Sequence, residues 1–182
     1  MNAIQNTRLA ALVTTVLIIC SIFFGANRSL SSLSYKAEAV FYEGEFGDGL
    51  GIQNDLNERI NLSYSFLTIA KKYIDSDSNE IQAVLTARDN LFNAQTPSEK
   101  SKANLQLTEA VTDLYNKTEQ LDFSEKDEGY RKSIYEDMKS RNDTISHDKY
   151  NQFVEEFNKQ IRIFPANFLA GITGVKSLER FN

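Results

Sequence analysis

The sequence predicts an all-α fold, in which one N-terminal transmembrane helix precedes an antiparallel bundle of long helices. Three observations lead to this fold class. An uncharged apolar run covers residues 9–26, apolar residues recur at helical spacing from residue 52 onward, and no useful stretch alternates apolar and polar residues as a β-strand does. With 182 residues, 41% of them hydrophobic and 25% charged, the chain has room for one anchor and one folded domain.

The apolar run at residues 9–26 follows an N-terminal tail, residues 1–8, and is 18 residues long. A helix of that length spans about 27 Å, close to the roughly 30 Å of a bilayer's hydrocarbon core. Cleavage after Ala26 would place Phe24 at the minus-three position, where a signal peptide needs a small residue. We therefore expect an uncleaved, single-pass anchor in the cell membrane rather than a secretion signal.

Cys20 lies inside this run and is the only cysteine, so the chain forms no internal disulfide and no cysteine zinc site. Ile19 precedes it where a lipoprotein attachment site has a small residue, and we interpret Cys20 as a lipid-facing thiol. Arg8 and the amino terminus nearly balance Arg28 and Lys36 across the run. The positive-inside rule then gives only a slight preference for an extracytoplasmic domain.

The charge of the remaining chain is acidic. Residues 1–26 hold one basic residue and no acidic one, which leaves 19 basic against 25 acidic groups, a formal net charge of −6. Because binding to duplex DNA needs clustered lysine and arginine, we expect no nucleic-acid partner.

Residues 27–51 read as a Ser/Gly-rich juxtamembrane linker with a short helix. Ala37, Val40 and Phe41 have helical spacing, and that pattern stops at Gly44. Four glycines then fall within eight residues, which predicts a flexible loop or hinge.

We expect the helical bundle to cover residues 52–175, followed by a C-terminal tail at 176–182. Its first helix spans 52–75, with Arg59 away from the apolar stripe, and its second runs from a capping box at Asp77 to Asn93. The third begins at Thr96–Pro97, a cap followed by proline. A polar stretch at 122–128 precedes a weaker helix, and the last helix runs from a cap at Ser146 to Pro165.

On and after the last helix, a set of residues recurs at a specific spacing: Tyr150, Asn151, Val154, Phe157, Asn158, Ile161, Phe164, Pro165, Asn167, Ala170 and Gly174. With these residues the segment resembles the signature of the LemA family. A second similar block comprises Arg59, Asn61, Leu62, Lys71, Tyr73, Val84, Ala87 and Arg88. The sequence departs from the family where Phe157–Asn158 replaces a Tyr-Asn pair, Val175 replaces a phenylalanine, Asn61 replaces an acidic residue and Tyr64–Ser65 replaces a Pro-Asn pair. The resemblance implies a single-pass anchor, a mostly antiparallel helical domain and no agreed catalytic activity.

Arg88 is one candidate site residue, because it lies on the apolar stripe of its helix, one turn from Val84 and Leu91. A guanidinium in that position needs a carboxylate or helix-end carbonyls as partners. The structural interpretation is a buried or half-buried clamp between helices, and the functional one is a contact to a ligand's carboxylate.

Further candidates lie on and after the last helix. Asn151 and Asn158 are seven residues apart and share one side of that helix, where amides commonly cap or cross-link helices. The alternative to core packing is a groove for a partner peptide, in which Tyr150, Asn151, Phe157 and Asn158 supply aromatic anchors and amides. Phe164, Pro165 and Asn167 complete the candidate structural or partner-contact residues.

Other patterns argue against catalytic, metal and cofactor sites. His147 is the only histidine and follows the expected cap Ser146, so we expect it at an exposed helix start. The acids around the glycines lack the EF-hand pattern, and the glycines lack the strand and the Lys-Ser or Lys-Thr pair of a phosphate loop. We expect no cofactor and no metal.

Two functional hypotheses remain. The first is a non-enzymatic, membrane-tethered interaction or scaffold protein of the bacterial cell envelope, which has a protein partner or forms a homo-oligomer. The second is a small-ligand-binding or hydrolytic domain that uses carboxylates and Arg88 in a cleft between helices. The residues after Pro165 form an amphipathic segment, which we expect to lie on a membrane surface or to fold back on the bundle.

Overall fold

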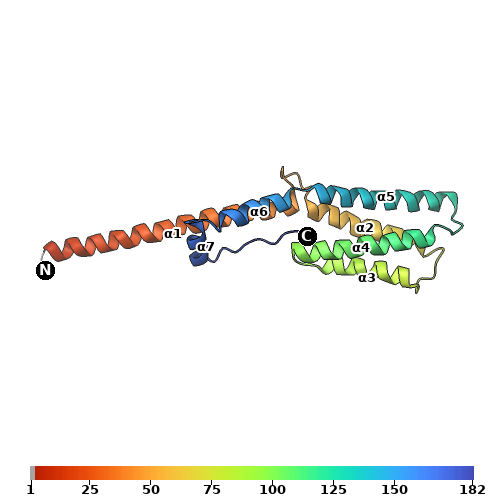
Figure 1. Cartoon of the computed structure of the whole chain (residues 1–182), viewed down its shortest axis with the longest axis horizontal. Coiled ribbons are helices and arrows are strands. Elements are labelled where there is room, and N and C mark those ends of the chain that lie inside the picture. Colours follow the sequence, from red (N-terminus) through yellow and green to blue (C-terminus); the bar gives the residue numbers. More distant parts are fainter. Residues whose placement is uncertain (1–2) are drawn as a thin grey trace. The chain divides into compact units, whose positions relative to one another are not determined.

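A computed structural model describes residues 3–182, and these residues form seven helices and no strand (Figure 1). The all-α fold class is confirmed. The helices are α1 (Ala3–Glu43), α2 (Ile52–Ala70), α3 (Asn79–Asn93), α4 (Pro97–Thr118), α5 (Glu125–His147), α6 (Tyr150–Gln160) and α7 (Ala166–Thr173). They belong to two compact units: the first holds the described residues up to Glu38 together with Phe153–Leu178, and the second holds Ala39–Gln152 and Glu179–Asn182.

α1 is long and apolar enough to cross a membrane. The large apolar side chains of residues 9–24 are mostly exposed to solvent in the structure, as in Leu12, which is 62% exposed. A helix of 41 residues is about 60 Å long, roughly twice the thickness of a bilayer's hydrocarbon core. The helix therefore continues well beyond the apolar run.

The expected break between the anchor and a short helix does not occur, because residues 27–43 continue α1. The serines in this segment disfavour a helix only weakly, and no glycine or proline interrupts residues 27–43. Leu30 and Ala37, seven residues apart, are both buried in the first unit. Tertiary packing thus outweighs the weak local preference for a linker.

The core of the first unit is a small apolar cluster. Leu30 and Ala37 of α1 pack with Phe157 and Ile161 of the α6 region and with Ala170 of α7. Sequence analysis placed the last helix in one bundle with the other helices, but most of α6 and all of α7 pack in this unit instead. Residues 166–178 accordingly belong to the first unit, whereas Glu179–Asn182 belong to the second.

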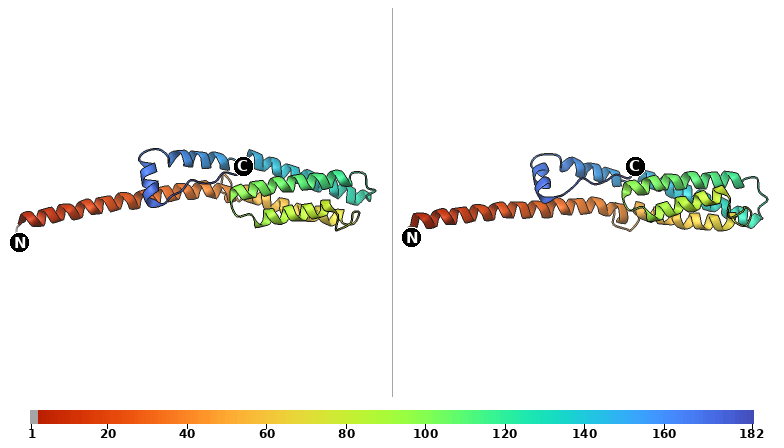
Figure 2. Two further views of the ribbon diagram at one scale, coloured as in Figure 1. Left: turned by 60° about the horizontal axis from the view of Figure 1, so that its bottom comes forward. Right: turned by 90° about the horizontal axis from the view of Figure 1, so that it is seen from below.

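The second unit contains an antiparallel bundle of α2–α5, whose four helices lie side by side in all three views (Figures 1 and 2). α2 packs mainly on α5 and α3, and α3 packs on α4. The interior is formed by apolar side chains at helical spacing: Leu56, Phe66, Leu67, Ile81, Val84, Leu91, Leu107, Val111, Leu114 and Met138.

The start of α4 is confirmed as a complete capping box. The Thr96 side chain accepts from the Glu99 amide, the Glu99 carboxylate accepts from the Thr96 amide, and Pro97 is the first helical residue. The cap of α3 is Ser78 and not Asp77, because the Ser78 hydroxyl accepts from the Ile81 amide.

Two further boundaries differ from the prediction. The polar stretch 122–128 is partly helical, because Ser124 caps α5. Glu125, Asp127 and Glu128 therefore lie in the first turn of α5, where carboxylates interact favourably with the helix dipole. At its other end α5 continues through Ser146 to His147. His147 is exposed as expected, but it lies at a helix end and not at a helix start.

The glycine loop between α1 and α2 has a defined conformation. The Gly49 amide donates to the Glu43 carbonyl at 2.9 Å, and the Leu50 amide donates to the Asp48 carboxylate at 3.0 Å. Gly44 has a φ of +75°, which favours glycine, and a Cβ on Gly51 would lie 2.5 Å from the Phe41 carbonyl oxygen.

Candidate interaction site

In the first unit, Asn158 of α6 holds the extended segment that follows α7. Its side-chain nitrogen donates to the Leu178 carbonyl at 2.9 Å, and its side-chain oxygen accepts from the Leu178 amide at 2.8 Å. Both polar atoms of the amide thus bind one backbone residue. Phe157, which precedes Asn158, is 3% exposed and belongs to the apolar cluster.

In the second unit, the first turn of α6 holds the last residues of the chain in the same manner. Asn151 donates to the Phe181 carbonyl at 2.7 Å and accepts from the Phe181 amide at 2.8 Å. The Tyr150 hydroxyl donates to the Glu179 carbonyl at 2.7 Å. The Tyr150 ring is buried against Phe41 at a centroid distance of 5.1 Å.

In this structure the candidate residues of α6 make internal contacts. Tyr150 and Phe157 are core residues, and the amides of Asn151 and Asn158 bind the chain's own backbone instead of lining an open groove. Residues 176–182, expected as a simple tail, are therefore fastened at Leu178 and Phe181.

The remaining candidates of this region stand apart from those contacts. Phe164 is 78% exposed and Pro165 is also exposed. Asn167 is exposed, and its side-chain oxygen accepts from the next amide, that of Phe168, at 2.7 Å.

Arg88 does not clamp two helices together, although its side chain is half-buried as expected. Its guanidinium pairs with Asp89, the next residue of α3, at 2.8 Å. The side chain instead lines a groove of about 530 Å³ between α2 and α3, together with Ile60, Asn61, Tyr64, Ser65, Asp89 and Phe92.

A second groove, of about 730 Å³, lies on the other side of α2, next to α5. Tyr64 and Ser65 line both grooves, so the two form one continuous surface around α2. The exposed ring of Tyr130 and the side chain of Lys126 lie on its α5 side. Sequence analysis did not predict this surface.

The matching family model in the comparison with known proteins is that of the LemA family, over residues 50–182. The chain belongs to the LemA family. No curated protein matches the sequence. For this LemA-family protein the match covers the complete bundle α2–α5 as well as α6, α7 and the tail-binding residues.

Arg59 is the most buried arginine among the described residues of this LemA-family protein. The sequence pattern predicts it away from the apolar stripe of its helix. Arg59 is 1% exposed. Its guanidinium donates to the Met138 carbonyl at 2.5 Å and to the Thr108 hydroxyl at 2.6 Å, so it joins α2 to α5 and α4. The pKa of Arg59 is lowered to about 10, because the lowering by burial is larger than the raising by the nearby Asp55. The guanidinium is therefore charged at neutral pH.

The surroundings of Arg59 balance its charge incompletely. Asp55 is itself buried and pairs with Arg141 at 2.8 Å. The Arg59 Nε has no hydrogen-bond partner, although it is buried. Arg59 also lines a cleft of about 460 Å³ between α4 and α5, with neutral side chains such as Thr112 and Asn142 and three other charged ones.

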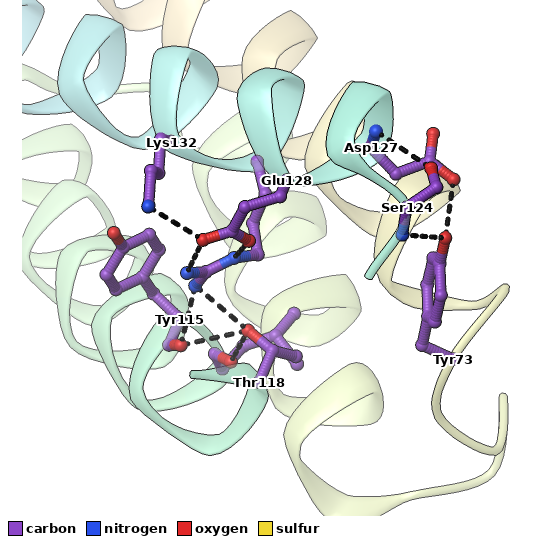
Figure 3. Close-up of polar contacts among 9 residues, drawn as sticks. Tyr73, Tyr115, Thr118, Ser124, Asp127, Glu128 and Lys132 are labelled. Carbon is purple, nitrogen blue, oxygen red and sulfur yellow. Dashed lines mark hydrogen bonds and ion pairs between the residues drawn. The ribbon is translucent and has the colours of Figure 1, made fainter. Parts of the chain in front are cut away.

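Arg131 of α5 is the second buried arginine. Its guanidinium has several hydrogen-bond partners, among them the labelled Glu128, Tyr115 and Thr118 (Figure 3). Glu128 binds the guanidinium with both oxygens, at 2.7 and 3.0 Å, and the Tyr115 carbonyl accepts at 3.1 Å. The Tyr115 ring lies 4.1 Å from the guanidinium carbon. Hydrogen bonds from Arg131 are the largest cause that lowers the pKa of Glu128, to about 2.

Near Arg131, Tyr73 and Asp127 fasten the turn after α2 to the start of α5 (Figure 3). The Tyr73 hydroxyl donates to the Asp127 carboxylate at 2.8 Å and accepts from the Ser124 amide at 3.1 Å. Lys72 pairs with the same carboxylate at 2.9 Å. These networks hold the helices of the bundle together. Within residues 3–182, no three acidic, histidine or cysteine side chains converge as a metal site.

Proposed function

We propose that this protein is a non-enzymatic interaction or scaffold protein of the bacterial cell envelope, tethered by a single pass of α1 through the membrane. The observation that carries the proposal is the continuity of α1. Its N-terminal part exposes apolar side chains, and Leu30 and Ala37 of the same helix are core residues of a folded unit. Such a helix serves as both an anchor and a part of the domain it anchors.

The bundle supports an interaction role by what its polar side chains do. Arg59, Arg131 and Asp127 bind backbone atoms or side chains of other segments of the bundle. The surface around α2, in contrast, exposes aromatic rings. Aromatic side chains are over-represented at the energetic centres of protein interfaces.

Carbonate extraction of membranes and impermeant thiol labelling test the anchor and its orientation. In a Cys20→Ser background, Ser133→Cys on α5 gives the labelling position for the bundle, and Asn6→Cys gives the matched position at the other end of α1. We expect the protein to resist carbonate and Ser133→Cys alone to react on intact cells. Release by carbonate contradicts the tether. Labelling of Asn6→Cys alone contradicts the expected orientation, in which the bundle lies on the extracytoplasmic side.

The alternative function is binding of a small ligand in a cleft between helices. The observation in its favour is the cleft of about 460 Å³ beside the buried Arg59, and not Arg88, which pairs with Asp89. Titration with inorganic phosphate and acetate, followed by NMR of the α4 and α5 amides, tests it. Saturable shifts confined to the residues around Arg59 favour a ligand site, and absence of such shifts favours the interaction role.

A further inference from the structure

The surface around α2 differs from the rest of the bundle in the side chains that it exposes. Every exposed residue of α2 is uncharged: Asn57, Asn61, Tyr64, Ser65 and Thr68. The neighbouring α4, in contrast, exposes Glu99, Lys102 and Glu109. α2 therefore presents an uncharged ridge to solvent in a chain of which 25% is charged.

Exposed aromatic rings surround this ridge on three helices. Tyr64 of α2 is 64% exposed, Phe92 of α3 is 72% exposed and Tyr130 of α5 is 52% exposed. Phe92 lines the groove beside α3, Tyr130 lines the groove beside α5, and Tyr64 lines both. We call this surface, made of the two grooves and the ridge between them, the α2 face.

The charges on the α2 face have a positive balance. The grooves contain three cations, Lys72, Arg88 and Lys126, against two carboxylates, Asp89 and Asp127. Arg88 engages Asp89, and Lys72 with Tyr73 engages Asp127, while Lys126 lies 5.8 Å from the centre of the Tyr130 ring. The face thus bears a net charge of +1, whereas the whole protein has a net charge of −5.

The groove between α3 and α4 provides an internal comparison. It is lined by Glu109 and Asp113 with no cation, and its other residues are polar or alanine. It offers neither a large apolar side chain nor a positive charge. The combination found on the α2 face is therefore not a general property of grooves in this bundle.

We propose that the α2 face binds an acidic amphipathic helix of another protein. The partner's apolar side chains enter the two grooves beside Tyr64, against Phe92 and Tyr130, and its carboxylates meet Lys126. Grooves between helices accept side chains that recur at helical spacing, and opposite charges at the rim align the partner. This inference rests on the proposed interaction function and names the surface and the kind of partner.

Photo-crosslinking from the full-length, membrane-anchored protein in its own cells tests the proposal. A photoreactive amino acid replaces Ser65, which lines both grooves, and in a matched strain it replaces Gln106 of the acidic α3–α4 groove. Sequencing of the crosslinked peptides by mass spectrometry then gives the chemistry of the captured segment. We expect the Ser65 probe to capture a segment of another protein with apolar residues at helical spacing and an excess of Asp and Glu.

Variants of the α2 face sharpen the test. Phe92→Ala removes an aromatic anchor and should reduce capture about tenfold or more, the effect of a loss of about 1.4 kcal/mol at an interface. Lys126→Glu should reduce it about threefold and make the remaining capture less sensitive to salt. Leu105→Ala, which truncates an exposed leucine of α4, is the control and should leave capture unchanged.

Several outcomes overturn the proposal: capture of a second copy of this chain, of lipid, of a basic or uncharged segment, or of nothing from Ser65. Equal capture of one segment from Ser65 and Gln106 does so as well. If the Gln106 probe alone captures a protein, the interaction function stands and the assignment to the α2 face fails. Loss of carbonate resistance instead contradicts the proposed tether.

Discussion

The two units of the protein bury different kinds of side chain. In the first unit the cluster of Leu30, Ala37, Phe157, Ile161 and Ala170 is wholly apolar. All buried polar and charged residues among those described lie in the second unit: Asp55, Arg59, Ser63, Asn104, Thr118 and Arg131. An apolar cluster tolerates small shifts of one helix against another, whereas a buried guanidinium is satisfied in one helix register only. We infer that buried polar contacts define the register of the bundle.

The two buried arginines illustrate different ways to satisfy such a charge. Arg131 has a bidentate carboxylate, a carbonyl and an aromatic ring as neighbours. Arg59 binds only a carbonyl and a hydroxyl directly, and its Nε lacks a partner. The cost of desolvation is therefore offset less completely at Arg59.

Truncation of Arg59 should produce the largest effect. Arg59→Ala removes the hydrogen bonds to the Met138 carbonyl and the Thr108 hydroxyl and creates a cavity, so the free energy of unfolding should fall by about 3–4 kcal/mol. Urea denaturation followed by near-ultraviolet circular dichroism measures it. Arg59→Met is the control: it fills the space without a charge and should cost less than about 1.5 kcal/mol. An equal loss in both variants would show that the charge itself is required.

The tail contacts of the first unit should rank second. Asn158→Ala removes two hydrogen bonds to Leu178, each worth about 1 kcal/mol, so we expect a loss of about 1–2 kcal/mol and faster hydrogen exchange at the Leu178 amide. Asn167→Ala removes an amide that binds only its neighbour and should change stability by less than about 0.5 kcal/mol. Unchanged exchange at Leu178 would contradict the contact.

A smaller effect is expected at the cap of α4. Thr96→Ala should reduce stability by about 1 kcal/mol, because the first turn loses its side-chain acceptor. Ser146→Ala tests the boundary that the sequence predicted incorrectly: Ser146 lies inside α5, so its replacement should cost less than about 0.5 kcal/mol. A larger loss of stability in Ser146→Ala than in Thr96→Ala would instead support Ser146 as a helix cap.

The smallest effect concerns pH. The pKa of Glu128 is lowered from 4.5 to about 2 by its contacts, first among them the hydrogen bonds from Arg131. A lowered carboxyl pKa stabilises the fold fully above the unfolded value, and this contribution is lost as pH falls from about 4.5 to about 2. Glu128→Gln should therefore flatten the dependence of unfolding free energy on pH in that window. If the pH dependence of the unfolding free energy is unaltered in Glu128→Gln, the pair of Glu128 with Arg131 does not contribute to stability.

The sequence predicted features that depend on local chemistry and failed where distant contacts decide. The start of α4 followed from Thr96, Pro97 and Glu99 alone, since a cap needs only adjacent residues. The continuation of α1 through residues 27–43 was missed, because Leu30 and Ala37 are stabilised by α6 and α7, more than a hundred residues later in the chain. No local signal in a serine-rich segment gives that information.

Among the site residues, the arginines show the same division. Arg88 was singled out because it lies on an apolar stripe, yet its guanidinium reaches only Asp89. Arg59 was overlooked, although it lies three residues after Leu56 and seven before Phe66, both buried. That spacing places Arg59 on the buried face of α2, but a search for apolar residues alone does not include an arginine. The acceptors of Arg59 come from α4 and α5, which no helical pattern around Arg59 reveals.

The bidentate contacts of Asn151 and Asn158 have an evolutionary consequence. A carboxamide that binds both the amide and the carbonyl of one residue recognises the main chain, and any amino acid except proline provides those two groups. Substitutions at exposed tail positions such as Ser177 should therefore be almost neutral, whereas an inserted or deleted residue shifts the main chain relative to the carboxamide. Natural selection in this region should act on segment length more strongly than on composition.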